Sequence, residues 1–68
     1  MNITDIIKME CVNQHISISE LAEKLGSSKQ NLSNKLSRND FKFSDIEKIF
    51  NVLNLELKII NKSGMEYK

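Results

Sequence analysis

The sequence predicts a small, mainly α-helical domain that ends in a β-strand or hairpin. The 68 residues include no proline and only two glycines, a composition that suits a compact helical fold. Apolar residues recur at helical spacing up to about Asn54, and beyond it residues 55–60 alternate with a period of two. We therefore expect a helical domain over residues 1–54 and a C-terminal strand or hairpin over residues 55–68.

The first helix is expected to follow Asn2 and to fade near Gln14 and His15. Asn2 and Asp5 have the spacing of a capping box, in which each side chain bonds the other residue's backbone N–H. One face of this helix is apolar and is expected to enter the core. Its residues are Ile3, Ile6, Ile7 and Cys11, with Val12 at the edge.

Two short helices are expected on either side of Gly26. Ser17 and Glu20 form a second capping box, and Ser28 is the expected N-cap of a third helix that runs to about Leu36. Glycine is favoured directly after a helix because it adopts positive φ without strain. The residues that these two helices are expected to bury are Leu21, Ala22, Leu25, Leu32 and Leu36.

The fourth helix is expected after a break at residues 38–40. Phe41 and Phe43 are expected to plug the core from this loop. Ser44 and Glu47 have capping-box spacing, and the apolar positions that follow have the i, i+3, i+4, i+7 pattern of an amphipathic helix. Its stripe, and the residue expected to end it in the left-handed conformation, are Ile46, Ile49, Phe50, Leu53 and Asn54.

Residues 55–60 predict a strand, residues 61–64 (NKSG) a turn, and residues 65–67 a short return strand. A lone strand leaves backbone groups unpaired on both edges, and a two-stranded hairpin is marginal in water. We therefore expect a two-fold homodimer that is joined partly by this segment. The expected dimerisation residues are Leu55, Leu57, Ile59 and Ile60.

Positive charge is concentrated in residues 27–42, which hold four basic residues and one acidic residue. Residues 1–26, in contrast, hold two basic and four acidic residues. A basic segment of this kind is a footprint for a polyanion. The single cysteine and the expected lack of a signal peptide indicate a reducing cytoplasm, and the longest apolar run is too short to span a bilayer.

The sequence offers no pattern typical of catalysis or metal binding. It has one histidine and one cysteine, and it lacks a phosphate loop, a paired-carboxylate arrangement and zinc-ligand spacing. His15 is expected near a helix C terminus, where the helix dipole favours positive charge, and Cys11 is expected in the core. We therefore expect neither an enzyme nor a bound metal or cofactor.

Residues 16–36 (ISISELAEKLGSSKQNLSNKL) resemble the helix-turn-helix motif of the Cro and phage-repressor (XRE-type) family. They contain the family's pattern of serine, x, x, Glu, Leu, Ala, x, x, Leu, Gly in full. A small residue at Ala22 suits a close helix crossing, Gly26 suits the turn, and Leu32 pins the third helix so that its other face can enter a major groove. The resemblance covers about residues 3–55 and implies a lambda-repressor-like four-helix domain.

The resemblance also implies a function. It indicates a sequence-specific transcriptional regulator, most simply a repressor from a phage or mobile element, that inserts the helix Ser28–Leu36 into double-stranded DNA in a bacterial cytoplasm. Lysine can donate to guanine, and glutamine or asparagine can pair with adenine. By position, the base-reading residues are Lys29, Gln30, Ser33 and Asn34. The phosphate-binding residues are Ser17, Ser28, Asn31, Lys35, Arg38, Asn39 and Lys42.

Three features depart from the family pattern, and the modest net charge of +1 leaves other functions open. Ile18 stands where a phosphate-binding glutamine is frequent, Ser27 stands where an apolar residue is usual, and residues 55–60 replace the usual fifth helix. One alternative is a protein-interaction module whose strand adds to a partner's sheet. Another is a DNA-binding antitoxin that neutralises a partner protein.

Overall fold

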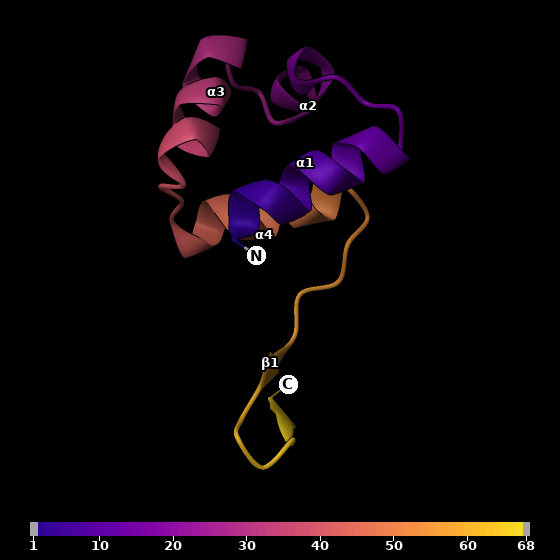
Figure 1. Cartoon of the computed structure of the whole chain (residues 1–68), viewed down its shortest axis with the longest axis vertical. Coiled ribbons are helices and arrows are strands. Elements are labelled where there is room, and N and C mark those ends of the chain that lie inside the picture. The colour runs from indigo at the N-terminus through magenta and orange to yellow at the C-terminus, as the bar shows by residue number, and fades with distance from the viewer. Residues whose placement is uncertain (1, 68) are drawn as a thin grey trace.

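The computed structural model describes residues 2–67, and in this range four α-helices precede a two-stranded hairpin, which confirms the mainly helical fold. Helix α1 overlaps α4 in the view of Figure 1, and α2 and α3 lie together above them. The hairpin extends away from the helices on a length of irregular chain. The longest dimension of the molecule is 39 Å. The elements are α1 (Ile3–Asn13), α2 (Ile18–Lys24), α3 (Lys29–Arg38), α4 (Phe43–Val52), β1 (Ile59–Ile60) and β2 (Glu66–Tyr67).

The hydrophobic core forms where the four helices meet. All of its buried apolar residues belong to the predicted stripes, because helical spacing places them on one face of each helix. Burial also raises the pKa of the Cys11 thiol, so Cys11 is a protonated core residue. The buried members are Ile7, Cys11, Leu21, Ala22, Leu32, Leu36, Ile49, Phe50 and Leu53.

Two residues that were expected in the core, Phe43 and Leu25, are not fully buried. Phe41 packs against the core as expected, but Phe43 is 55% exposed at the first position of α4. Leu25 is half-buried rather than buried, because it lies at the end of α2 where the chain turns away. Of the two phenylalanines, Phe41 is therefore the one that packs against the core.

The first three helices begin at the predicted caps. The side chains of Asn2, Ser17 and Ser28 each accept a hydrogen bond from the backbone N–H three residues on, at 2.9, 3.0 and 3.1 Å. The predicted capping box of Ser44 and Glu47 is wrong, because Ser44 lies inside the helix. Helix α4 begins at Phe43, one residue before the predicted N-cap.

The start of α4 is set by Asp45 instead. Its Oδ2 accepts a hydrogen bond from the backbone N–H of Lys42 at 3.2 Å, and Lys42 is the residue that precedes the helix. A carboxylate in the first turn also interacts favourably with the helix dipole. Asp45 therefore takes the place that the sequence analysis gave to Glu47.

Each helix is followed by a residue with positive φ. The values are 57° at His15, 70° at Gly26, 51° at Asn39 and 59° at Asn54. The next backbone N–H then bonds a carbonyl five residues back, as from Ser27 to Ala22 at 2.9 Å. Gly26 and Asn54 act as predicted, whereas α3 continues two residues beyond Leu36 and the break begins at Asn39.

Replacing His15 with glycine should stabilise the protein. His15 is exposed, and an L-residue with a φ of 57° is strained in a way that glycine is not. The free energy of unfolding should rise by about 0.5–1 kcal/mol, measured by urea denaturation. His15→Ala is the matched control, because it keeps the Cβ and should bring no gain. A loss of stability in His15→Gly would contradict this account.

Thr4 ties the start of α1 to the end of α3. Its buried Oγ1 lies 2.8 Å from the carbonyl oxygen of Leu36 and 3.1 Å from Oδ1 of Asn39, and its backbone N–H donates to the same Oδ1 at 3.3 Å. At the other end of α1, Nε2 of Gln14 donates to the carbonyl oxygen of Leu53 at 2.6 Å. These bonds fix α1 against both α3 and α4.

The predicted strand over residues 55–60 is much shorter in the structure. Leu55 packs against the core, residues 56–58 are irregular, and β1 pairs antiparallel with β2 of the same chain, with Ile60 opposite Glu66. The predicted turn between them forms because Oδ1 of Asn61 accepts hydrogen bonds from the backbone N–H groups of Ser63 and Met65. This local turn lets the segment pair within the chain.

Candidate nucleic-acid interface

Helix α3 is fixed on one side and open on the other. Leu32 and Leu36 are buried, and the turn at Gly26 connects α3 to α2. A Cβ at Gly26 would meet nothing within 4 Å, so the glycine is needed for its positive φ and not for space. The buried pair therefore determines which face of α3 points away from the core.

The open side of α3 is polar. Lys29, Gln30 and Asn34 are exposed, and Ser33 is half-buried. Ser37 is exposed too, and it lies three residues after Asn34 and four after Ser33, on the same side of the helix. The sequence analysis missed Ser37 because it ended the helix at Leu36, although the spacing alone indicates it. We call these five residues the α3 polar face.

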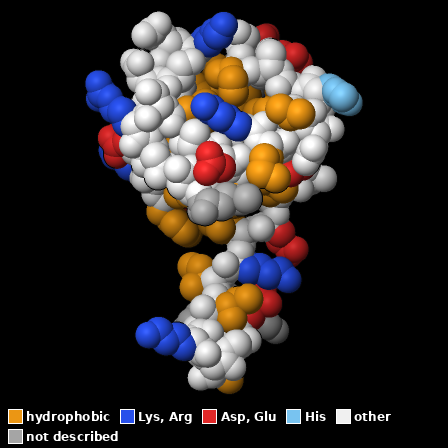
Figure 2. Space-filling model, in the orientation of Figure 1, with side chains coloured by type: hydrophobic (Ala, Val, Ile, Leu, Met, Phe, Trp, Pro, Cys, Tyr) orange, Lys and Arg blue, Asp and Glu red, His pale blue; other side chains and the backbone are white. Residues whose placement is uncertain are grey.

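A polar groove of about 340 Å³ lies beside this face, between α3 and the start of α4. Asn34 belongs to both the groove and the α3 polar face. On the α3 side of the helical domain, at the left in Figure 2, basic side chains project outward with acidic ones near them. The groove is lined by Asn31, Asn34, Lys35, Arg38, Asp40, Lys42 and Asp45.

The Lys35 side chain forms an ion pair with an acidic side chain inside this groove. Its Nζ lies 3.1 Å from Oδ2 of Asp45. The backbone N–H of Lys42 and the Lys35 ammonium together hold the pKa of Asp45 below its ordinary value, so Asp45 is a carboxylate at neutral pH. The positive charge of Lys35 is therefore largely balanced by its neighbour.

Arg38 and Lys42 are the groove's available cations. Both side chains are exposed, and neither forms an ion pair with another residue in the range 2–67. They lie on either side of Asn39 and Asp40, at the end of α3 and just before α4. These two cations border the groove at the end of α3, with the exposed carboxylate of Asp40 between them in the chain.

Three other predicted phosphate-binding side chains already use some of their hydrogen-bonding atoms within the protein. The Oγ atoms of Ser17 and Ser28 accept capping hydrogen bonds, so only their hydroxyl protons remain to be donated. Oδ1 of Asn39 lies within hydrogen-bond distance of Thr4, which leaves its Nδ2 as a donor. The structure thus gathers Asn31, Lys35, Arg38 and Lys42 around the groove, with Ser17, Ser28 and Asn39 outside its lining.

No family model, curated protein or solved structure matches this chain. None of the helices formed by residues 2–67 is long and apolar enough to cross a membrane. Within the same range, His, Cys, Asp and Glu side chains form no group of three that could hold a metal ion. The candidate interface therefore depends on the geometry of α3 and on the groove beside it.

Proposed function

We propose that the protein is a sequence-specific transcriptional regulator, most simply a repressor, that inserts α3 into the major groove of double-stranded DNA. The main observation in favour is the division of α3 into a buried apolar side and an exposed polar side. A major groove about 12 Å wide admits one helix, and side chains on its outer face then reach the base edges. The α2–α3 pair acts as a helix-turn-helix, with α2 behind the inserted helix.

The exposure of the individual side chains supports the following roles. Lys29, Gln30 and Asn34 read base edges, because the Lys29 ammonium is free to donate and the two amide groups are free to donate and accept. Arg38 and Lys42 bind the phosphate backbone beside the α3 polar face. Lys35 contributes less to phosphate binding because Asp45 already balances its charge.

Selection of bound DNA fragments from a whole genome or a random pool tests this proposal. We expect one sequence class to be enriched, and its affinity, followed by fluorescence anisotropy, to fall linearly with the logarithm of the salt concentration. The enriched site should cover less than one turn of the duplex for each α3. Failure to enrich any sequence, together with no salt-dependent binding, would refute DNA recognition.

Replacing Asn34 with alanine should relax sequence preference more than it weakens binding in general. Loss of one base contact costs about 1–3 kcal/mol on the selected site and little on unrelated DNA. Asn13→Ala is the matched control, because Asn13 is an exposed asparagine at the end of α1. Anisotropy on matched and scrambled duplexes gives both affinities. An equal loss on every sequence would reject the base-reading role of Asn34.

The hairpin favours a protein contact as a second function. Ile59, Ile60 and Met65 are 54%, 57% and 68% exposed, although all three are large apolar residues. Surfaces of this kind commonly mark sites of association with another protein.

A further inference from the structure

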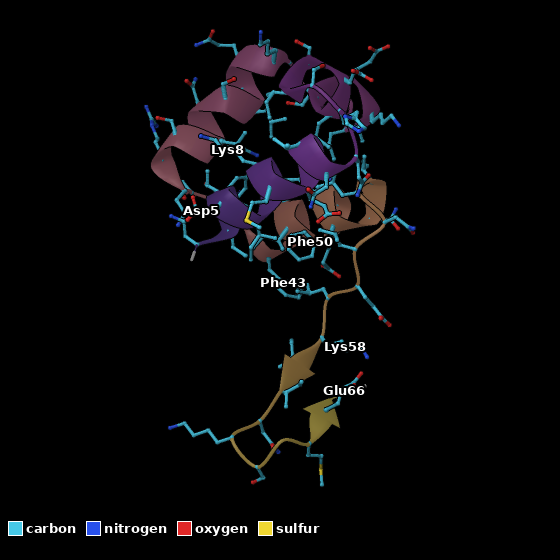
Figure 3. The ribbon with its side chains drawn as sticks, turned by 45° about the vertical axis from the view of Figure 1, so that its right-hand side comes forward. Asp5, Lys8, Phe43, Phe50, Lys58 and Glu66 are labelled. Carbon is cyan, nitrogen blue, oxygen red and sulfur yellow. The ribbon has the colours of Figure 1, made fainter. Side chains whose placement is uncertain are left out.

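Among residues 2–66, Thr4 is the one polar residue that is buried. It belongs to the first turn of α1, where Figure 3 labels its neighbour Asp5, and it lies against the last turn of α3. Burying a polar group is costly unless that group is hydrogen-bonded. The hydroxyl and the backbone N–H of Thr4 both find acceptors at the end of α3, so Thr4 links the start of one helix to the end of another.

The side chain of Asn39 caps α1 from thirty-five residues away. The first N–H groups of a helix have no partner within it, and the N–H of Thr4 is one of these. It donates to Oδ1 of Asn39 at 3.3 Å. Oγ1 of Thr4 lies 3.1 Å from the same Oδ1 and 2.8 Å from the carbonyl oxygen of Leu36. Oδ1 of Asn39 is therefore directed toward α1.

This arrangement also sets the direction of the other half of the Asn39 amide. The amide group is planar, so Nδ2 must point away from the atoms that hold Oδ1. Nδ2 carries two protons that it can donate. Because Asn39 is an exposed residue, these protons are available to an acceptor outside the protein.

The turn after α3 does not by itself explain an asparagine at position 39. The φ of Asn39 is 51°, and glycine adopts such a value without strain, as Gly26 does after α2. An amide at this position adds the cap on α1 and the outward Nδ2. In the chain, Asn39 lies between Arg38 and Lys42, the two cations that are available to an anion.

We propose that Thr4 is a positioning residue for DNA binding, which holds Oδ1 of Asn39 so that Nδ2 donates to a backbone phosphate beside Arg38. This role rests on the proposed recognition of DNA. Thr4 is buried and touches no DNA itself. Hydrogen bonds to an ionised oxygen are stronger than neutral ones, and a donor that is already held in place loses less conformational freedom on binding. Thr4 thus makes the start of α1 part of the support of the DNA interface.

Fluorescence anisotropy with a labelled duplex of the enriched sequence, and with its scrambled counterpart, tests this role. The temperature is one at which circular dichroism shows every variant to be folded. Asn39→Gly keeps the left-handed turn and removes the amide, so DNA affinity should fall about tenfold, as for loss of one hydrogen bond to a charged group. Thr4→Val removes the hydroxyl and should lower the affinity at least about threefold, equally on both duplexes, because phosphate contacts carry no sequence information. Thr4→Ser keeps the hydroxyl and should restore the affinity.

A double variant separates positioning from support of the fold. If Thr4 acts through the amide, Thr4→Val combined with Asn39→Gly should bind DNA no more weakly than Asn39→Gly alone. Ile7→Val is the matched control, because Ile7 is buried on the same helix and its side chain has no polar group. This control should lower stability but leave DNA affinity unchanged.

Two results would overturn the positioning role and leave DNA recognition intact. One is a folded Thr4→Val variant that binds both duplexes as tightly as the unchanged chain does. The other is a double variant in which the two losses multiply, because Thr4 would then act without the Asn39 amide. If the unchanged chain binds neither duplex, DNA recognition is refuted and the positioning role is refuted with it.

Discussion

Replacing Leu21 with alanine should lower the free energy of unfolding by about 2–5 kcal/mol, because it removes a fully buried side chain from the centre of the core. A domain of this length has a total stability of only about 3–10 kcal/mol. The loss is therefore a large fraction of the total stability, and the variant should unfold at a markedly lower urea concentration. Urea denaturation followed by circular dichroism measures the change.

The position of Leu21 explains this large effect. Helix α2 has seven residues, too few to be stable by itself, so its packing against the core determines whether it forms. Loss of α2 would also remove the support of α3 and the turn at Gly26. Leu25→Ala is the matched control, because this leucine of the same region is half-buried and should cost less. Equal losses for the two variants would contradict the central role of Leu21.

The core could be predicted from the sequence because it depends on local periodicity. The buried residues recur at helical spacing, and the caps at Asn2, Ser17 and Ser28 are signals within four residues of each helix start. The start of α4 was misplaced because Asp45 and Glu47 are equivalent by type, and only the bond to the backbone of Lys42 distinguishes them.

The structure of residues 55–67, the C-terminal tail, was harder to predict for a different reason. Alternation of apolar and polar residues indicates extended chain, but it does not say which strand is the neighbour. In the structure, Leu55 is drawn against the helical core and the side chain of Asn61 builds a tight turn, so β1 is left with two residues. Phe43 is exposed for a related reason, because the tail of the same chain does not cover that side of α4.

The sequence predicted every residue of the α3 polar face except Ser37, but it did not predict which neighbouring charges are paired. Lys35 is paired with Asp45, ten residues away, and Asn39 is bonded to Thr4, thirty-five residues away. No local pattern contains both members of either pair. The sequence therefore ranks Lys35, Arg38 and Lys42 alike, whereas the structure separates the balanced lysine from the two available cations.

The difference between the paired Lys35 and the two available cations, Arg38 and Lys42, predicts that their replacement has unequal effects on DNA binding. Replacing both Arg38 and Lys42 with alanine should lower DNA affinity about 100-fold at 0.1 M salt, because each lost phosphate contact costs about tenfold. The slope of log affinity against log salt should fall by about two, and equally on all sequences. Fluorescence anisotropy over a salt series measures both quantities.

The ion-pair variant Lys35→Ala with Asp45→Asn, and Lys24→Ala, provide the comparisons for the variant that lacks Arg38 and Lys42. The ion-pair variant removes one positive and one negative charge together, so the affinity should fall less than for either Arg38→Ala or Lys42→Ala alone. Lys24, in the last turn of α2, lies outside the groove, and its loss should have little effect. If the ion-pair variant weakens binding as much as Arg38→Ala, DNA must displace Asp45 from Lys35, and the salt slope would then fall by about one for this variant as well.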